Sequence, residues 1–182
     1  MEWLQSHEII KSWLTIVGGL LALSFGLYRY HKGQLWKKSE FAASQLDLLW
    51  KDDRIRFCCL ALDCSTKSVT VPAAHGPAFT HTARLMQEAL RTENERVDFD
   101  WPLSYYRECF DRFFDYLSTI NHYIDIGLFT AQDILPLHYW LKQIASPRFL
   151  DSKPLLVDYC RYHDFDGVEA LLKKIERHLG RQ

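Results

Sequence analysis

The sequence lacks an excess of either charge and lacks a cysteine framework. Its 22 Lys and Arg residues oppose 23 Asp and Glu residues, which leaves a formal net charge of −1. Nucleic-acid-binding proteins need a basic excess to neutralise phosphates, so this balance excludes tight DNA or RNA binding. The cysteines number five, and an odd, widely spaced set argues against a disulfide framework and suits a reducing compartment.

Motifs for cofactors and metals are also missing. Gly76 stands alone, and the one pair of adjacent glycines lies within an apolar run, so no glycine-rich phosphate loop is present. Cys58, Cys59 and Cys64 come nearest to zinc-ligand spacing. Adjacent cysteines on a helix point about 100° apart, however, and no second ligand pair follows. We therefore expect no cofactor and no metal ion.

What the sequence does contain is an uncharged run from Ser12 to Tyr28, which predicts a membrane-spanning helix. About 17 residues rising 1.5 Å each cover roughly 26 Å of a bilayer core near 30 Å. Amphipathic aromatic rings, which prefer the membrane interface, bracket the run. They belong to Trp3, Trp13, Tyr28, Tyr30 and Trp36. A buried helix of a soluble domain is the alternative, but it would not explain these rings.

The charges on the two flanks predict the orientation of this span. Arg29, Lys32, Lys37 and Lys38 follow it, whereas residues 1–8 contain two Glu and no Lys or Arg. The positive-inside rule keeps the basic flank in the cytoplasm, and the N-terminal charges do not fit a cleaved signal peptide. We expect a single-pass membrane protein with its N-terminus outside and its C-terminal domain cytoplasmic. The basic flank also suits contact with anionic lipid headgroups.

Small residues recur every four positions within the span, at Gly18, Ala22 and Gly26. Such a stripe lets a second membrane helix approach closely, which predicts a homo-oligomer. The alternative is that glycine and alanine are simply common in membrane helices.

The remaining chain predicts a mainly α fold, with residues 1–33 as anchor and basic flank and residues 34–182 as a cytoplasmic helical bundle. Period-two alternation over Lys67–Pro72 predicts at most a short strand or hairpin. Apolar spacing and capping residues predict the helices. We expect them at 34–50, at 54–63 with Asp52 or Asp53 as the cap, at 80–91, at 103–124, from Asp133 to Ala145, from Asp151 or Ser152 to 162, and from Asp164 or Asp166 to 178.

The strongest helical signal lies between Leu103 and Ile124, where apolar residues step alternately by three and four positions. This segment predicts a central helix, which Gly127 ends with a left-handed cap. For the helix that follows, we expect Asp133 as N-cap and Pro136 in the first turn.

The order of these features resembles a family. Trp36-Lys37-Lys38-Ser39-Glu40-Phe41 lies just inside a single span. A helix ending in Leu62-Asp63 precedes a short β segment, and the aromatic-rich helix Phe110–Gly127 runs into a glycine turn. Over most of residues 30–145 the chain is similar to uncharacterised bacterial single-pass membrane proteins, although Cys64 stands where a Trp is expected. The resemblance implies a location in a bacterial inner membrane, and it carries no functional residue with it.

Titratable groups on the central helix offer one candidate for catalysis. His122 and Asp125 are one turn apart, and Asp111 and Asp115 form an i, i+4 carboxylate pair, a set that can be imagined as a general acid and base. Ordinary ion pairs along an exposed helix face explain the charges more simply. Those pairs would be Arg107–Asp111 and Glu108–Arg112.

Aromatic residues make up 14% of the chain, and they dominate both cores and interface hot spots. Our leading hypothesis is a non-enzymatic, membrane-anchored protein whose helical domain binds a protein partner, as an accessory subunit or adaptor. The second is a self-assembling membrane effector, for example in bacterial defence. The third is an enzyme that uses His122 and the nearby carboxylates.

Overall fold

A computed structural model describes residues 2–63, 76–92, 100–145 and 155–179, except for the side chains of residues 2–12, 15 and 179. The fold is mainly α, as predicted. The helices are α1 (Glu2–Lys51), α2 (Asp53–Asp63), α3 (Ala83–Ala89), α4 (Trp101–Asp125), the 3-10 helix η2 (Leu135–Leu137), α5 (His138–Ala145), α6 (Leu155–Tyr162) and α7 (Asp166–Leu179). The predicted strand Lys67–Pro72 lies outside the described residues.

The chain divides into two compact units, Met1–Phe41 and Ala42–Gln182. Unit 1 is helical throughout its described part, and unit 2 holds the end of α1 and all later helices. Within the residues that the structure describes, no helix offers an apolar stretch long enough for a membrane crossing.

A side-chain cap separates α1 from α2. The Oδ1 atom of Asp52 accepts hydrogen bonds from the backbone N–H of Arg54 at 3.0 Å and of Ile55 at 3.3 Å. These bonds satisfy donors that the first turn of a helix leaves unpaired. Arg112 of α4 also donates to the Asp52 carboxylate, at 3.1 Å. The cap therefore forms where the sequence predicted it, and it also ties the junction to α4.

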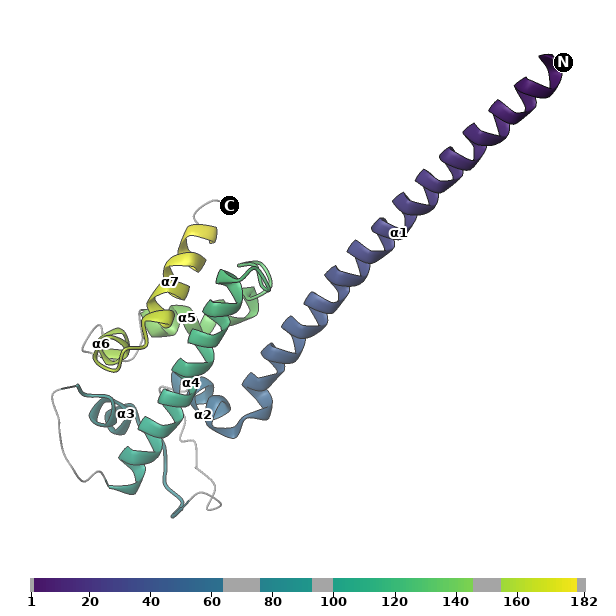
Figure 1. The fold of residues 1–182 in the computed structure, drawn as a ribbon. Helices are drawn as coiled ribbons and strands as arrows, with labels where there is room; N and C mark the ends of the chain where they lie inside the picture. The colour runs from purple at the N-terminus through teal and green to yellow at the C-terminus, as the bar shows by residue number, and fades with distance from the viewer. Residues whose placement is uncertain (1, 64–75, 93–99, 146–154, 180–182) are drawn as a thin grey trace. The chain divides into compact units, whose positions relative to one another are not determined.

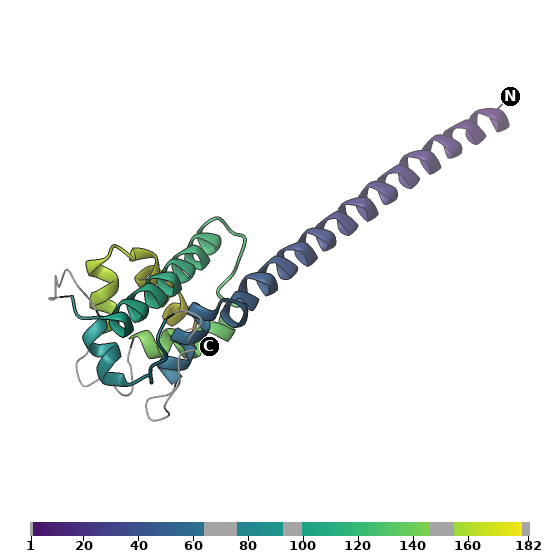
Figure 2. The same ribbon diagram turned by 90° about the horizontal axis from the view of Figure 1, so that it is seen from below.

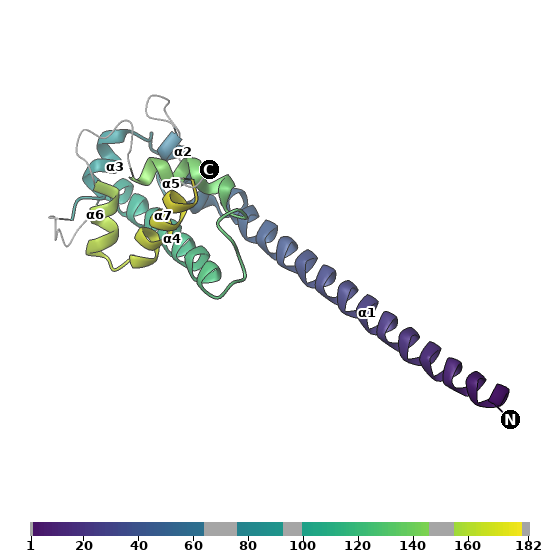
Figure 3. The same cartoon turned by 90° about the horizontal axis from the view of Figure 1, so that it is seen from above.

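Unit 2 is built around α4, which contacts α2, α3 and α7 (Figure 1, Figure 2, Figure 3). The seam predicted from the three-four spacing is buried along most of its length, with Ile124 only half-buried. Its buried members are Leu103, Tyr106, Phe110, Phe113, Leu117 and Ile120. Phe114 and Tyr116 are buried as well, so α4 packs against neighbours on more than one side.

The C-terminal end of α4 also follows the prediction. Gly127 has a φ of 72°, and its N–H donates to the carbonyl of Ile124 at 3.0 Å. The N–H of Leu128 donates to the carbonyl of Tyr123 at 2.9 Å. A left-handed residue at this place satisfies the last carbonyls of the helix, and glycine adopts that conformation without a Cβ penalty.

The start of the next helix differs from the prediction of Asp133 as its N-cap. The Asp133 carboxylate instead accepts from the N–H and hydroxyl of Thr130, at 2.8 and 2.7 Å, and so closes the preceding turn. The segment then begins as the 3-10 helix η2, with Ile134 at its N-cap position, before α5 follows. Pro136 does lie in this first turn, as expected. Proline has no backbone N–H, but the N–H groups of a first turn have no partner within the helix, so the absence costs nothing there.

Two further helix starts are defined by short contacts. Thr82 caps α3 by accepting from the N–H of Leu85 at 3.2 Å, so this helix is shorter than the predicted 80–91. Gly167, in the first turn of α7, lies against Ser118 of α4, and a Cβ added to it would be 2.8 Å from Ser118 Cβ. Asp164, which has a φ of 58°, lies in the turn before Asp166, where α7 begins.

Candidate functional site

The small-residue stripe lies on the surface of unit 1. Gly18, Ala22 and Gly26 are all exposed, and a Cβ added to either glycine would meet no atom within 4 Å. The surface around them is apolar. Leu14, Leu21 and Phe25, for example, are 67%, 66% and 62% exposed. The stripe is therefore open to a second helix, and its role in helix packing stays a prediction.

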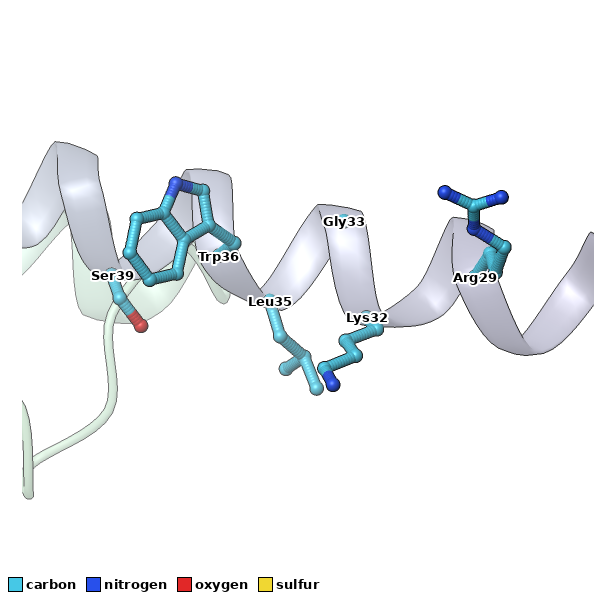
Figure 4. A pocket seen from close by; sticks show the side chains of 6 residues that line it. All are labelled: Arg29, Lys32, Gly33, Leu35, Trp36 and Ser39. Carbon is cyan, nitrogen blue, oxygen red and sulfur yellow. The ribbon is translucent and has the colours of Figure 1, made fainter.

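The predicted basic flank is exposed too, and it borders a shallow hollow of about 530 Å³ on the surface of α1. The residues that line the hollow are Arg29, Lys32, Gly33, Leu35, Trp36 and Ser39. In Figure 4 the side chains of Arg29 and Trp36 extend to one edge of the hollow, and those of Lys32 and Leu35 extend to its other edge. Lys37 and Lys38 follow directly and are exposed. The Arg29 guanidinium lies over the ring of Phe25, 5.9 Å from its centroid.

The four groups considered for catalysis do not converge on one place. His122 is exposed, and its ring centroid lies 6.3 Å from that of Tyr123. Asp125 instead binds Lys174 of α7, whose Nζ atom also donates to Asn121 at 2.7 Å. Asp115 is exposed on another part of the helix surface.

The fourth of these groups, Asp111, belongs to a polar cluster that the sequence did not reveal. Its Oδ1 atom accepts from the hydroxyl of Tyr159, at 2.7 Å. Arg107, one turn earlier, donates to the carbonyl of Ala89 and to Nε2 of His163, both at 2.9 Å. The cluster thereby joins the end of α3, α4 and the end of α6. Tyr159 is fully buried, so no substrate reaches its hydroxyl.

The cluster fixes the protonation of its members. A guanidinium only donates, so Nε2 of His163 accepts and the neutral ring carries its proton on Nδ1. Burial first, and then the positive charge of Arg107, lower the pKa of His163. Burial and the hydrogen bond to Asp111 raise the pKa of Tyr159. The arrangement holds an uncharged His and an uncharged Tyr, which suits a structural clamp.

Other charges on α4 pair with neighbouring helices. Glu108 forms an ion pair with Arg54 of α2, and Arg112 pairs with Asp52 at 3.1 Å. The sequence instead predicted a Glu108–Arg112 pair within the helix. Spacing along one helix does not show which charges an adjacent helix brings near, so these cross-helix pairs were missed.

The cysteines that the structure describes in unit 2 are packed in its interior. Cys58, Cys59, Cys109 and Cys160 are buried, and Cys64 lies outside the described residues. Burial raises the pKa of Cys59 and of Cys109 to about 12. A thiol with such a pKa is protonated at neutral pH and is a poor nucleophile and metal ligand. Among the described residues, no three or more His, Cys, Asp or Glu side chains are placed to hold a metal ion.

Unit 2 also carries an aromatic patch that is open to solvent, formed by Trp50, Tyr139 and Trp140. Trp50 is 55% exposed and Tyr139 is 40% exposed. The Trp140 ring meets Trp50 edge-on at 5.8 Å and Tyr139 edge-on at 5.7 Å. The Tyr139 hydroxyl donates to Asp63 Oδ1 at 2.5 Å, which fixes the ring. Trp and Tyr held in place this way are typical of protein–protein hot spots.

No protein-family model, curated protein or solved structure matches the chain. The resemblance to bacterial single-pass proteins therefore stays a prediction, and the arguments that follow use the chain's own residues.

Proposed function

We propose that this is a membrane-anchored, non-enzymatic protein whose helical unit 2 binds a protein partner, as an accessory subunit or adaptor of a membrane complex. The observation that carries the proposal is the exposed apolar surface of α1 in unit 1. Large side chains between Trp13 and Tyr28 are half to two-thirds exposed around the whole helix. A helix that is apolar all round needs cover, and lipid provides it on every side.

The absence of a sufficiently long apolar helix holds for the described residues, and the side chains of Ser12 and Thr15, at the start of the proposed anchor, lie outside them. With Lys11 and Arg29 able to extend their charges to the two interfaces, Ser12–Tyr28 forms the anchor in this proposal. In the same proposal, unit 2 lies in the cytoplasm of a bacterial cell, because the positive-inside rule keeps the basic residues from Arg29 to Lys38 on that side.

The aromatic patch supports the second half of the proposal. A core-forming aromatic residue is covered by its own domain, whereas Trp50 and Tyr139 keep about half of their surface in solvent. Rigid rings with two rotatable bonds lose little entropy when a partner covers them. We assign this patch as the contact surface for the partner.

The test is affinity purification of the tagged full-length chain from its native membranes in mild detergent. Mass spectrometry identifies what is retained, and the particle mass gives its stoichiometry. We expect the protein to stay in the membrane after alkaline extraction and to retain one stoichiometric partner. The Trp50→Ser and Tyr139→Ser variants lose that partner. Tyr162→Ser is the matched control, because Tyr162 is 52% exposed and lies outside the patch. Release of the protein from the membrane by alkali contradicts the anchor. Retention of the partner by the patch variants contradicts the contact surface.

A second candidate function, a self-assembling membrane effector, is favoured by the open stripe of Gly18, Ala22 and Gly26. Small residues at this spacing allow close helix association in a bilayer. If the protein is such an effector, we expect the purified particle to be a homo-oligomer without a partner. We also expect overproduction to arrest growth and to let dye enter the cells. The double variant Gly18→Leu, Gly26→Leu abolishes both effects, and harmless overproduction of the unchanged chain contradicts this candidate.

A further inference from the structure

The hollow around Gly33 on α1 has the chemistry of a phospholipid headgroup site. Its lining sets cationic side chains beside apolar ones. Arg29 extends to the same edge of the hollow as Trp36, and Lys32 extends to the same edge as Leu35 (Figure 4). On a helix packed against protein, apolar groups and charges lie on different faces. Charges set directly beside exposed apolar groups are typical of the membrane interface, where headgroups and acyl chains meet.

Gly33 leaves the space that makes this surface hollow. Arg29 and Trp36 are seven positions apart in the sequence, which is two helical turns or about 10 Å along the axis. Gly33 lies between them on the same side. A Cβ at Gly33 would meet no atom within 4 Å. The guanidinium and the indole N–H are both hydrogen-bond donors, and donors that flank an open space suit the oxygens of a phosphate.

The charge around the hollow selects an anionic ligand. No Asp or Glu occurs between Glu8 and Glu40, whereas Lys37 and Lys38 follow the lining residues. A second copy of the chain would bring the same positive charges face to face, which is unfavourable. A free anion would leave Leu35 and Trp36, 67% and 73% exposed, in water. A phospholipid neutralises the charges and covers the apolar groups together.

We propose that the hollow lined by Arg29, Gly33 and Trp36 is a binding site for the phosphate headgroup of an anionic phospholipid. The inference rests on the proposed membrane anchor, since only a chain held at a bilayer presents this surface at headgroup depth. It goes further by placing a defined lipid at defined residues. Lys32 and Leu35, at the other edge of the same hollow, extend the contact to the neighbouring lipids.

The experiment uses the full chain with two kinds of vesicle, phosphatidylcholine alone and phosphatidylcholine mixed with phosphatidylglycerol. Flotation with the first kind tests the anchor without anionic lipid. For the second kind, extraction into mild detergent followed by mass spectrometry gives the ratio of phosphatidylglycerol to phosphatidylcholine that stays bound. We expect flotation with both kinds and a ratio well above that of the vesicles.

The variants separate the hollow from general positive charge. Replacing Arg29 and Lys32 by Gln lowers the ratio about fivefold for each charge removed. Gly33→Leu keeps every charge but fills the hollow, and we expect it to lower the ratio severalfold. The matched control, Lys142→Gln with Arg177→Gln, removes two exposed charges from unit 2 and leaves the ratio unchanged.

The outcomes distinguish the inference from the proposed function. A chain that floats with neither kind of vesicle contradicts the anchor itself. A chain that floats with both but retains the two lipids in vesicle proportion overturns the headgroup site and leaves the anchor standing. A wild-type ratio in Gly33→Leu overturns the hollow as the site. Dimers that retain no lipid preference and are lost in Gly33→Leu overturn it in favour of contact between two chains.

Discussion

Replacing Gly167 by Ala should destabilise unit 2, because it forces α4 and α7 apart. The new Cβ would be 2.8 Å from both Cβ and Oγ of Ser118 and 2.9 Å from its Cα. A rotamer change of Ser118 moves Oγ only, so the backbone itself must shift. Overpacking of this kind costs about 1–3 kcal/mol, whereas the gain in helix propensity is at most about 1 kcal/mol. Because the backbone must shift, we expect the overpacking to dominate, with a net loss of about 1–2 kcal/mol.

The assay is thermal unfolding of the full chain in mild detergent, followed by near-ultraviolet circular dichroism, to which the packed aromatic residues of unit 2 contribute. For a domain of this size the loss lowers Tm by roughly 2–8 °C. In a Ser118→Gly background the cost of Gly167→Ala should fall, since two of the three close atoms are gone. Gly33→Ala is the control, because its Cβ meets nothing. An unchanged or raised Tm for Gly167→Ala, or an equal cost in both backgrounds, would refute the reasoning.

Three further predictions concern unit 2 and use the same chain. Gly76→Ala should lower the stability measured by urea unfolding by about 1–3 kcal/mol, and an unaltered midpoint contradicts this. The reason is that Gly76 has a φ of 142° and that the new Cβ would be 2.2 Å from the Trp101 ring. Tyr159→Phe should cost about 1–2 kcal/mol by the same assay, and stability equal to wild type would show that water replaces the lost donor. That donor is the Tyr159 hydroxyl, which lies 2.7 Å from the Asp111 carboxylate. Asp52→Asn should be less stable than wild type at neutral pH, and the difference should disappear in acid, which urea unfolding across pH measures.

The pH dependence of the last prediction follows from the Asp52 carboxylate. Burial raises its pKa, but the hydrogen bonds from Arg112 and from the N–H groups of Ile55 and Arg54 outweigh burial and lower it. A group whose pKa is lower in the folded state stabilises the fold above its unfolded value, near 4. That contribution is lost as the pH falls through the folded pKa. If the wild type were still more stable than Asp52→Asn in acid, this account would be contradicted.

The helices that the sequence predicted best are those with a strong local signal. The three-four spacing of α4 needs no partner to be recognised, and Gly127 marks its end because few other residues adopt a positive φ without cost. Asp52 was one of the two residues predicted as the cap of α2, because the side chain of a cap acts on the two or three residues that follow. Asp133 offered the same signal, but its carboxylate accepts from two donors of Thr130, which precedes it, and not from the helix that follows. The local sequence pattern does not show which of these donors the carboxylate binds.

The polar contacts between helices could not be predicted in the same way. Arg107 and Asp111 fit an exposed ion pair on α4, yet α6 brings Tyr159 and His163 against them. The aromatic patch combines Trp50 with Tyr139 and Trp140, which are about ninety positions later in the chain. Which side chains from distant segments meet depends on packing, and a single sequence does not record packing.

Because four thiols are buried, their chemical modification can measure local unfolding of this protein. Cys58, Cys59, Cys109 and Cys160 are distributed over α2, α4 and α6, and all are inaccessible in the folded state. After replacement of Cys64 by Ser, an alkylating reagent reacts only with molecules in which one of these helices has detached. The modification rate at each position then gives the free energy of that local opening. Mass spectrometry of the labelled peptides would show whether the three helices separate together or one at a time.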